Sequence, residues 1–295
     1  MIQTFEQSAQ DYLAKLKMRK RKPVKATTLA TFSSAVKLAL QMPGFGGLTL
    51  ESIDSEHLRL LAESIGEKSP QTINLTVRVV KSVVSSAVDD RGNQLFPKKW
   101  NHAHIDLPPV TSLEKEVLKA GEVEAAIAAA PQKMKAFIAV QAASGLRRGE
   151  MLALNIDDFD PVAGTLRVDE TTGYYGVSSP KTKSANRVVD IHPLIVDLLV
   201  RATAENKGRI FPVTVDIARR TFERLNIRAH DLRHFRYTHL QRAEIPNAIR
   251  DYWIGHASKG MERVYGHVAQ DKALKHRLVE SIGIGFNLSE PDALA

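Results

Sequence analysis

Apolar residues recur at helical spacing through the first hundred residues of the chain. In FEQSAQDYLAKLK, residues 5–17, they line one face and leave a basic face opposite, which is typical of an amphipathic helix. Capping residues predict three more helices: TTLATFSSAVKLAL capped by Thr27 or Thr28, SEHLRLLAESI capped by Asp54, and SPQTINLTVRVVKSVVSSAV beginning at Ser69-Pro70. The last is rich in β-branched residues, so its length and its cap signals decide for helix over strand.

The remainder of the chain mixes helical and strand patterns. EVEAAIAAAPQKMKAFIAVQAAS predicts a long helical stretch, whereas TLRVDE, YYGVSS and NRVVDIH are short runs of strand character separated by Gly, Pro and Asn. From PLIVDLLVRATAE onward the pattern is helical almost to the end. The predicted fold class is therefore mainly α with a small antiparallel β-sheet.

A break in the pattern divides the chain. Between residues 96 and 119, three prolines and mixed charges interrupt the periodicity, which indicates a linker. A chain of 295 residues is long enough for two separate cores. We predict a helical domain at 1–107, a linker at 108–118 and an α+β domain at 119–295.

Charge favours a polyanionic partner. The chain has 41 Lys and Arg residues against 33 Asp and Glu, a formal net charge of +8, so nucleic acid is the first partner to test. The excess is densest in KLKMRKRKPVK, which could equally be a solvated surface. Its candidate DNA-binding residues are Lys15, Lys17, Arg19, Lys20, Arg21, Lys22 and Lys25.

Other classes of protein are disfavoured. The chain has no cysteine, which excludes disulfides, thiolate nucleophiles and Cys-ligated metals. No apolar run approaches the roughly 20 residues that span a bilayer, and the N-terminus lacks the order of a signal peptide. We expect a cytoplasmic protein with no membrane partner.

The segment AHDLRHFRYTHLQ allows three interpretations. His230 and His234 have the spacing of a zinc-binding helix, but Arg233 would place a permanent cation beside the metal. A basic surface helix with incidental histidines is the second interpretation. In the third, His230 and Arg233 share one helix face and bind a phosphate, the guanidinium holding its oxygens while the imidazole exchanges a proton.

Two other segments strengthen the third interpretation. In ASGLRRGEMLALNIDDF, a Gly145-Leu146 turn precedes Arg147, which opens a new helix with Glu150 close by. In WIGHASKGMERVYGHV, His256 precedes Tyr265 by nine residues.

Taken together, GLRRGE, HDLRH and GH-x8-Y resemble the three signature boxes of the tyrosine recombinases, the integrase family of site-specific DNA recombinases. The order and spacing match across the second domain, and the helical N-terminal region resembles the family's core-binding domain. The resemblance implies a core-binding domain at 1–107 and a catalytic domain at 119–295.

The resemblance also implies roles for individual residues. Tyr265 matches the nucleophile, Arg147 and Arg233 match the phosphate-binding pair, and His230 matches the proton-transfer histidine. His256 occupies the position that supports the scissile phosphate or the tyrosine.

Two further residues complete the implied site. Glu150 matches an acidic position that organises the first arginine, and Lys181 matches the general acid of a β-hairpin, with Lys183 as its competitor. Arg148 is the competing neighbour of Arg147, and Arg236, expected to be solvated, is that of Arg233.

The implied activity cuts and rejoins duplex DNA through a 3′-phosphotyrosyl intermediate, with no metal, ATP or other cofactor, in a homotetramer on two recombination sites. A catalytically silent, sequence-specific DNA-binding protein would use the same basic surface and remains the alternative. The amphipathic tail DKALKHRLVESIGIGF could pack on a neighbouring subunit or on its own domain.

Overall fold

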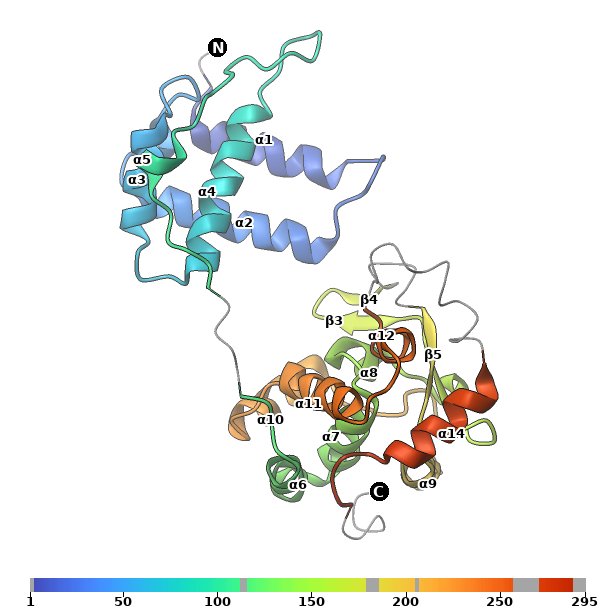
Figure 1. Ribbon diagram of the computed structural model, residues 1–295. Helices are drawn as coiled ribbons and strands as arrows, with labels where there is room; N and C mark the ends of the chain where they lie inside the picture. The colour runs from blue at the N-terminus through green and yellow to red at the C-terminus, as the bar shows by residue number, and fades with distance from the viewer. Residues whose placement is uncertain (1–2, 112–115, 179–185, 205–206, 257–270, 289–295) are drawn as a thin grey trace. The chain divides into compact units, whose positions relative to one another are not determined.

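The protein consists of two compact units. The computed structural model describes residues 3–111, 116–178, 186–204, 207–256 and 271–288. The two units are Met1–Glu114 and Lys115–Ala295 (Figure 1). Each unit has its own cluster of buried apolar side chains, so each is held together by its own core.

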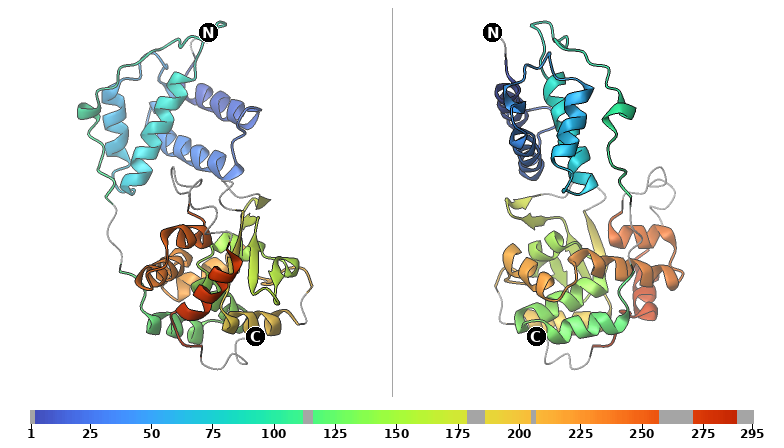
Figure 2. Two further views of the ribbon diagram at one scale, coloured as in Figure 1. Left: turned by 45° about the vertical axis from the view of Figure 1, so that its right-hand side comes forward. Right: turned by 90° about the vertical axis from the view of Figure 1, so that its left-hand side faces the viewer.

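The first unit is helical. It contains α1 (Phe5–Lys17), α2 (Ala26–Gln41), the 3-10 turn η1 (Phe45–Gly47), α3 (Ser55–Ser64), α4 (Pro70–Ser85) and the short α5 (His102–Ile105). Helices α1 and α2 lie side by side, and α4 packs against both (Figures 1 and 2). The turn η1 places Phe45 edge-on against Phe5, with ring centroids 5.0 Å apart.

Side-chain caps explain where two of these helices begin. Asp54 accepts a hydrogen bond from the His57 amide at the start of α3, and Ser69 accepts one from the Thr72 amide at the start of α4, as the sequence predicts. Helix α2 differs, because it begins at Ala26 with Lys25 as an N-cap that makes no side-chain cap bond. The carbonyl of Lys25 already accepts the amide of Leu29, so this helix starts before either threonine.

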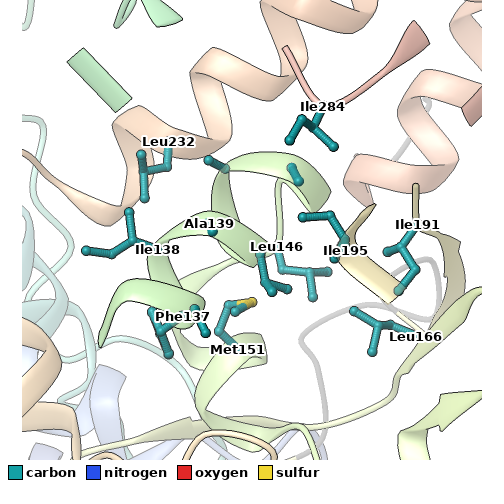
Figure 3. Close-up of a cluster of buried hydrophobic side chains, with 14 of the residues drawn as sticks. Phe137, Ile138, Ala139, Leu146, Met151, Leu166, Ile191, Ile195, Leu232 and Ile284 are labelled. Carbon is teal, nitrogen blue, oxygen red and sulfur yellow. The ribbon is translucent and has the colours of Figure 1, made fainter. Parts of the chain in front are cut away.

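The second unit is built around one central helix. Helix α7 (Gln132–Ser144) is buried at every residue from 136 to 144. Figure 3 shows Phe137, Ile138 and Ala139 of this helix in the core, with Leu146 and Leu232. The helices packed against α7 are α6 (Ala120–Ala129), α8 (Arg148–Ala153), α9 (Pro193–Thr203) and α11 (Ala229–Arg242).

The helical stretch predicted from residues 122–144 is two helices. Pro131 separates α6 from α7, because its ring nitrogen has no hydrogen to donate to a preceding carbonyl. The break lets α6 fold back against α7.

The second unit also contains two small antiparallel sheets. The first has the order β1-β2-β5, from β1 (Phe159–Asp160), β2 (Thr165–Val168) and β5 (Arg187–Asp190); the second pairs β3 (Thr171–Gly173) with β4 (Gly176–Ser178). Leu166 pairs with Val189, and both are buried against the core. Tyr174 and Tyr175 form the β3–β4 turn instead of the predicted strand.

The remaining elements lie on the same unit. They are the 3-10 turn η2 (Ile156–Asp158), α10 (Val215–Arg224), α12 (Asn247–Ile254) and α14 (Lys272–Ile282). Val279, Ile284 and Phe286 of the C-terminal segment are buried in the core of their own unit. The described part of the tail therefore packs on its own domain, one of the two arrangements the sequence left open.

The observed class agrees with the predicted one, mainly α with small antiparallel sheets. Within the described ranges, none of the helices combines the length and apolar character that crossing a membrane requires.

The cap of α4 provides a test of the first unit. Replacing Ser69 with alanine removes the hydroxyl that accepts a hydrogen bond from the Thr72 amide. We therefore expect urea denaturation to show a free energy of unfolding lower by about 1 kcal/mol. Ser82→Ala is the matched control, because the Ser82 hydroxyl only bonds back to the Arg78 carbonyl within the helix. Equal losses in both variants would contradict a capping role for Ser69.

Candidate active site

Arg147 lies where α7 ends and α8 begins, as the sequence predicts. Gly145 ends α7 with a φ of +71°, and a β-carbon there would lie 2.6 Å from Cδ1 of Ile254. This tight turn brings Arg147 to the N-cap of α8. The Arg147 side chain is 44% exposed, so its guanidinium can reach a ligand.

Glu150 fixes Arg147. Its carboxylate, 3% exposed, accepts the Arg147 amide at 2.9 Å and Nη1 of the same residue at 2.7 Å. On the other side it accepts Nη1 and Nη2 of Arg187 at 3.2 and 2.9 Å. One buried carboxylate thus meets two guanidinium groups with charge-assisted bonds.

These contacts keep Glu150 ionised. Burial by itself raises the pKa of Glu150, but the hydrogen bonds and charges of Arg187 and Arg147 outweigh it, and the pKa falls below its ordinary value. The carboxylate therefore stays a fixed negative charge beneath Arg147 at neutral pH.

Arg233 is the second arginine of the site and is almost fully buried. It lies on α11, is 3% exposed, and donates from Nη1 to the carbonyl of Gly145 at 3.0 Å. Its Nη2 is buried and has no hydrogen-bond partner among the described residues. Burial, helped by the charges of Arg147 and Arg187, lowers the pKa of Arg233 to about 9, which still leaves it charged at neutral pH.

A buried guanidinium nitrogen with no partner is costly unless an incoming group satisfies it. The nearest large charges are those of Arg147 and Arg187, partly offset by Glu150. The local field therefore favours an anion at this position.

His230 lies in the first turn of α11, three residues before Arg233, and is exposed. Its ring contacts that of His234, with centroids 4.5 Å apart. Partial burial, His234 and the charge of Arg233 lower the pKa of His230 below its ordinary value. The imidazole is therefore neutral at neutral pH and can accept a proton.

His256 follows the end of α12. Gly255 ends that helix with a φ of +74°, and its carbonyl accepts Nη2 of Arg147 at 3.0 Å. A β-carbon on Gly255 would lie 2.7 Å from Nη1 of Arg187, so the turn has no room for a side chain. Burial and then the charge of Arg233 lower the pKa of His256.

The structure brings five predicted site residues together: Arg147, Glu150, His230, Arg233 and His256. Lys181 and Tyr265, and the competing Lys183, lie outside the described residues. The seven basic residues predicted to bind DNA belong to the first unit. All of them are exposed, at the end of α1 and in the segment leading to α2.

One predicted environment was wrong. Arg236, expected to be solvated, is 3% exposed and donates from Nη1 to the carbonyl of Gly283 at 2.8 Å. Helical spacing places Arg236 one turn beyond Arg233, on the face that the C-terminal segment covers. That covering segment is remote in sequence, so the pattern of α11 alone could not reveal it.

Arg187, the second partner of Glu150, was not among the residues predicted from the sequence. Its side chain is fully buried, and its Nε donates to the carbonyl of Trp253 at 2.9 Å. A signal was present, because an arginine directly before the apolar pair Val188-Val189 in a short strand has an uncommon position for a charge.

The described part of the chain contains no set of ligands that would support a zinc site. Among those residues, no group of three His, Asp or Glu side chains is arranged to hold a metal ion. Arg233, one turn from His230, supplies positive charge instead.

Comparison with known proteins places the second unit in a family. The sequence model of the phage integrase family matches residues 116–272, more than half of the chain. The chain belongs to the phage integrase family. The ICEBs1 integrase of Bacillus subtilis (strain 168) is 28% identical over 135 residues. That match covers 43% of this chain and 37% of the length of that relative.

Solved structures of integrases share the fold. The Tn1549 transposon integrase in complex with circular intermediate DNA superposes with a TM-score of 0.70 at 19% identity, covering 89% of this chain and 95% of that one. A lambda integrase tetramer bound to a Holliday junction gives a TM-score of 0.66 at 15% identity, covering 87% and 78%. At these identities the likeness is one of fold.

The turn at Gly255 yields a test of the site's packing. Gly255→Ala places a β-carbon on a left-handed backbone, where it collides with Arg187. We therefore expect denaturation to show a free energy of unfolding lower by about 2 to 4 kcal/mol. The matched control is Gly208→Ala, where φ is +87° but no atom lies within 4 Å of the added carbon. A loss no larger than that of the control would show that Arg187 is not packed against Gly255.

Proposed function

We propose that this phage integrase family member cuts and rejoins duplex DNA at specific sites through a 3′-phosphotyrosyl intermediate on Tyr265. The observation that carries the proposal is Nη2 of Arg233, a buried cationic donor left without a partner among the described residues. Beside it, Glu150 holds the guanidinium of Arg147 in one orientation. Together they offer a preformed place for one phosphate group.

Charge is the main requirement of this chemistry. Attack on a phosphodiester builds negative charge on the nonbridging oxygens, and fixed donors that already point at those oxygens lower the barrier. Arg147 and Arg233 would supply these donors, with His256 as a further contact. The proposed reaction therefore requires no divalent metal and no ATP.

Proton transfers complete the proposed step. The phenol oxygen of Tyr265 attacks phosphorus while its proton passes to the neutral imidazole of His230. The bond from phosphorus to the 5′ oxygen breaks, and Lys181 gives that oxygen a proton. Attack by a 5′-hydroxyl from a second duplex reverses these events and restores Tyr265.

Duplex DNA and further copies of the chain are the proposed partners. The exposed basic residues from Lys15 to Lys25 would contact the phosphate backbone, which fits the net charge of +8. The Tn1549 integrase structure holds DNA, and the lambda integrase structure is a tetramer on a Holliday junction. By analogy we propose a homotetramer on two sites, acting in the cytoplasm.

A covalent trap tests the proposal. Duplexes selected by the protein from a random pool are remade with a nick next to the cleaved bond, so that the freed fragment is lost and the adduct accumulates. In EDTA we expect a protein–DNA adduct that resists denaturation, that is absent in Tyr265→Phe, and that forms roughly 100-fold more slowly in Arg233→Lys.

Tyr175→Phe is the matched control, because Tyr175 lies exposed in the β3–β4 turn and should leave the adduct unchanged. Cleavage that needs a divalent metal, or an adduct that persists in Tyr265→Phe, would contradict the mechanism. Tight DNA binding with no adduct would favour the silent DNA-binding alternative.

A further inference from the structure

Strand β5 forms one edge of its sheet, and α12 packs against it (Figure 1). The Val188 amide donates to the Tyr252 hydroxyl at 3.2 Å, and Nε of Arg187 donates to the Trp253 carbonyl at 2.9 Å. The indole nitrogen of Trp253 donates to Oδ2 of Asp190 at 2.7 Å. Both the backbone and the side chain of Trp253 are thus fixed to one strand.

Lys275 of α14 joins this cluster. Its Nζ lies 3.1 Å from the same Oδ2 of Asp190 and 5.0 Å from the ring centroid of Tyr252. Lys275 is 5% exposed and Asp190 is 8% exposed, so the pair is buried. A lysine is rarely buried to this extent, and here a carboxylate and an aromatic face accompany it.

A short series of contacts links this pair to the phosphate site. Trp253 is followed two residues later by Gly255, whose carbonyl accepts Nη2 of Arg147, and then by His256. A shift of Trp253 along β5 would move that carbonyl and the histidine together. Asp190 therefore connects α14 to the groups that orient Arg147.

The ion pair of Lys275 and Asp190 is not needed merely to attach α14 to the unit. Val279 is buried on the same helix and Leu278 packs beside it, so apolar contacts already attach α14 to the unit. Apolar contacts tolerate sliding and rotation of a helix, whereas an ion pair that shares its acceptor with an indole allows one register. Replacement of a buried ion pair by apolar groups is often neutral for stability, so the geometry is the property to examine.

We propose that Lys275 is a positioning residue for strand cleavage: paired with Asp190, it sets the register of α14 against the last turn of α12 and so fixes His256 and the acceptor of Arg147. The inference rests on the proposed function for its catalytic consequence. Lys275 would act through Asp190 and Trp253, without itself contacting DNA.

Four variants of the full chain distinguish an effect on the register of α14 from an effect on the stability of the protein. Lys275→Met and Asp190→Asn each leave one buried group without its partner, so both should lower the denaturation midpoint. The double variant removes both charges of this pair and keeps an acceptor for the Trp253 indole, so its midpoint should recover. Lys272→Met, an exposed lysine on the same helix, is the control and should match the parent.

The decisive quantity is the single-turnover rate of adduct formation on saturating nicked duplex, measured well below the denaturation midpoint. We expect Lys275→Met and the double variant to be slower by roughly 10- to 100-fold, with DNA affinity within about twofold of the parent. If the double variant regains the parental rate as well as its stability, the proposal is overturned. The same holds if Lys275→Met forms the adduct at the parental rate.

Hydrogen exchange on the DNA-free protein keeps the test independent of the proposed function. The amides of Gly255 and His256 both donate to the Asp251 carbonyl, and we expect them to exchange about 10-fold faster in Lys275→Met and the double variant than in Lys272→Met. Unchanged exchange would refute the coupling even if the parent forms no adduct. If the parent forms no adduct but the variants still show faster exchange, the proposed function is refuted and the coupling is not.

Discussion

The site depends on one buried carboxylate placed between two guanidinium groups. Glu150 is nearly inaccessible to water, and an unpaired charge there would be strongly destabilising. Arg187 compensates it from the core side, and Arg147 compensates it from the exposed side. Glu150 accepts hydrogen bonds from only some of the N–H groups of Arg147. These bonds orient the guanidinium and leave its other N–H groups available for other acceptors.

Two helix ends supply the rest of the orientation. Helices α7 and α12 both end at glycines with positive φ, and the carbonyls of Gly145 and Gly255 accept hydrogen bonds from Arg233 and Arg147. Carbonyls at a helix C-terminus have no partner within the helix and carry partial negative charge. Each arginine is thus held by a backbone group, and the arrangement leaves Nη2 of Arg233 without a partner in the described part of the chain.

Local pattern predicted the elements and the positions of the polar residues within them. Arg147 at a helix start after Gly145, and His230 with Arg233 on one helix, followed from turn chemistry and helical periodicity. The break at Pro131 is visible in the sequence, but the alanines on both sides favour helix and so suggest one continuous helix.

Partners that are remote in sequence could not be predicted in the same way. Arg187 meets Glu150 across 37 positions, and Arg236 meets Gly283 across 47. Single-element periodicity reports which face of a helix or strand is apolar, and it does not report what covers that face. The burial of Arg236 and the pairing of Lys275 with Asp190 belong to this class.

The central claim is that the two arginines form one oxyanion site, and it can be tested without knowing the DNA sequence. Crystals of the full chain soaked in tungstate, a phosphate-like dianion with a strong anomalous signal, would locate the site directly. We expect tungstate oxygens within hydrogen-bond distance of Nη2 of Arg233 and of the Arg147 guanidinium. Tungstate bound elsewhere at saturation, with Nη2 of Arg233 bonded to a protein group, would contradict it.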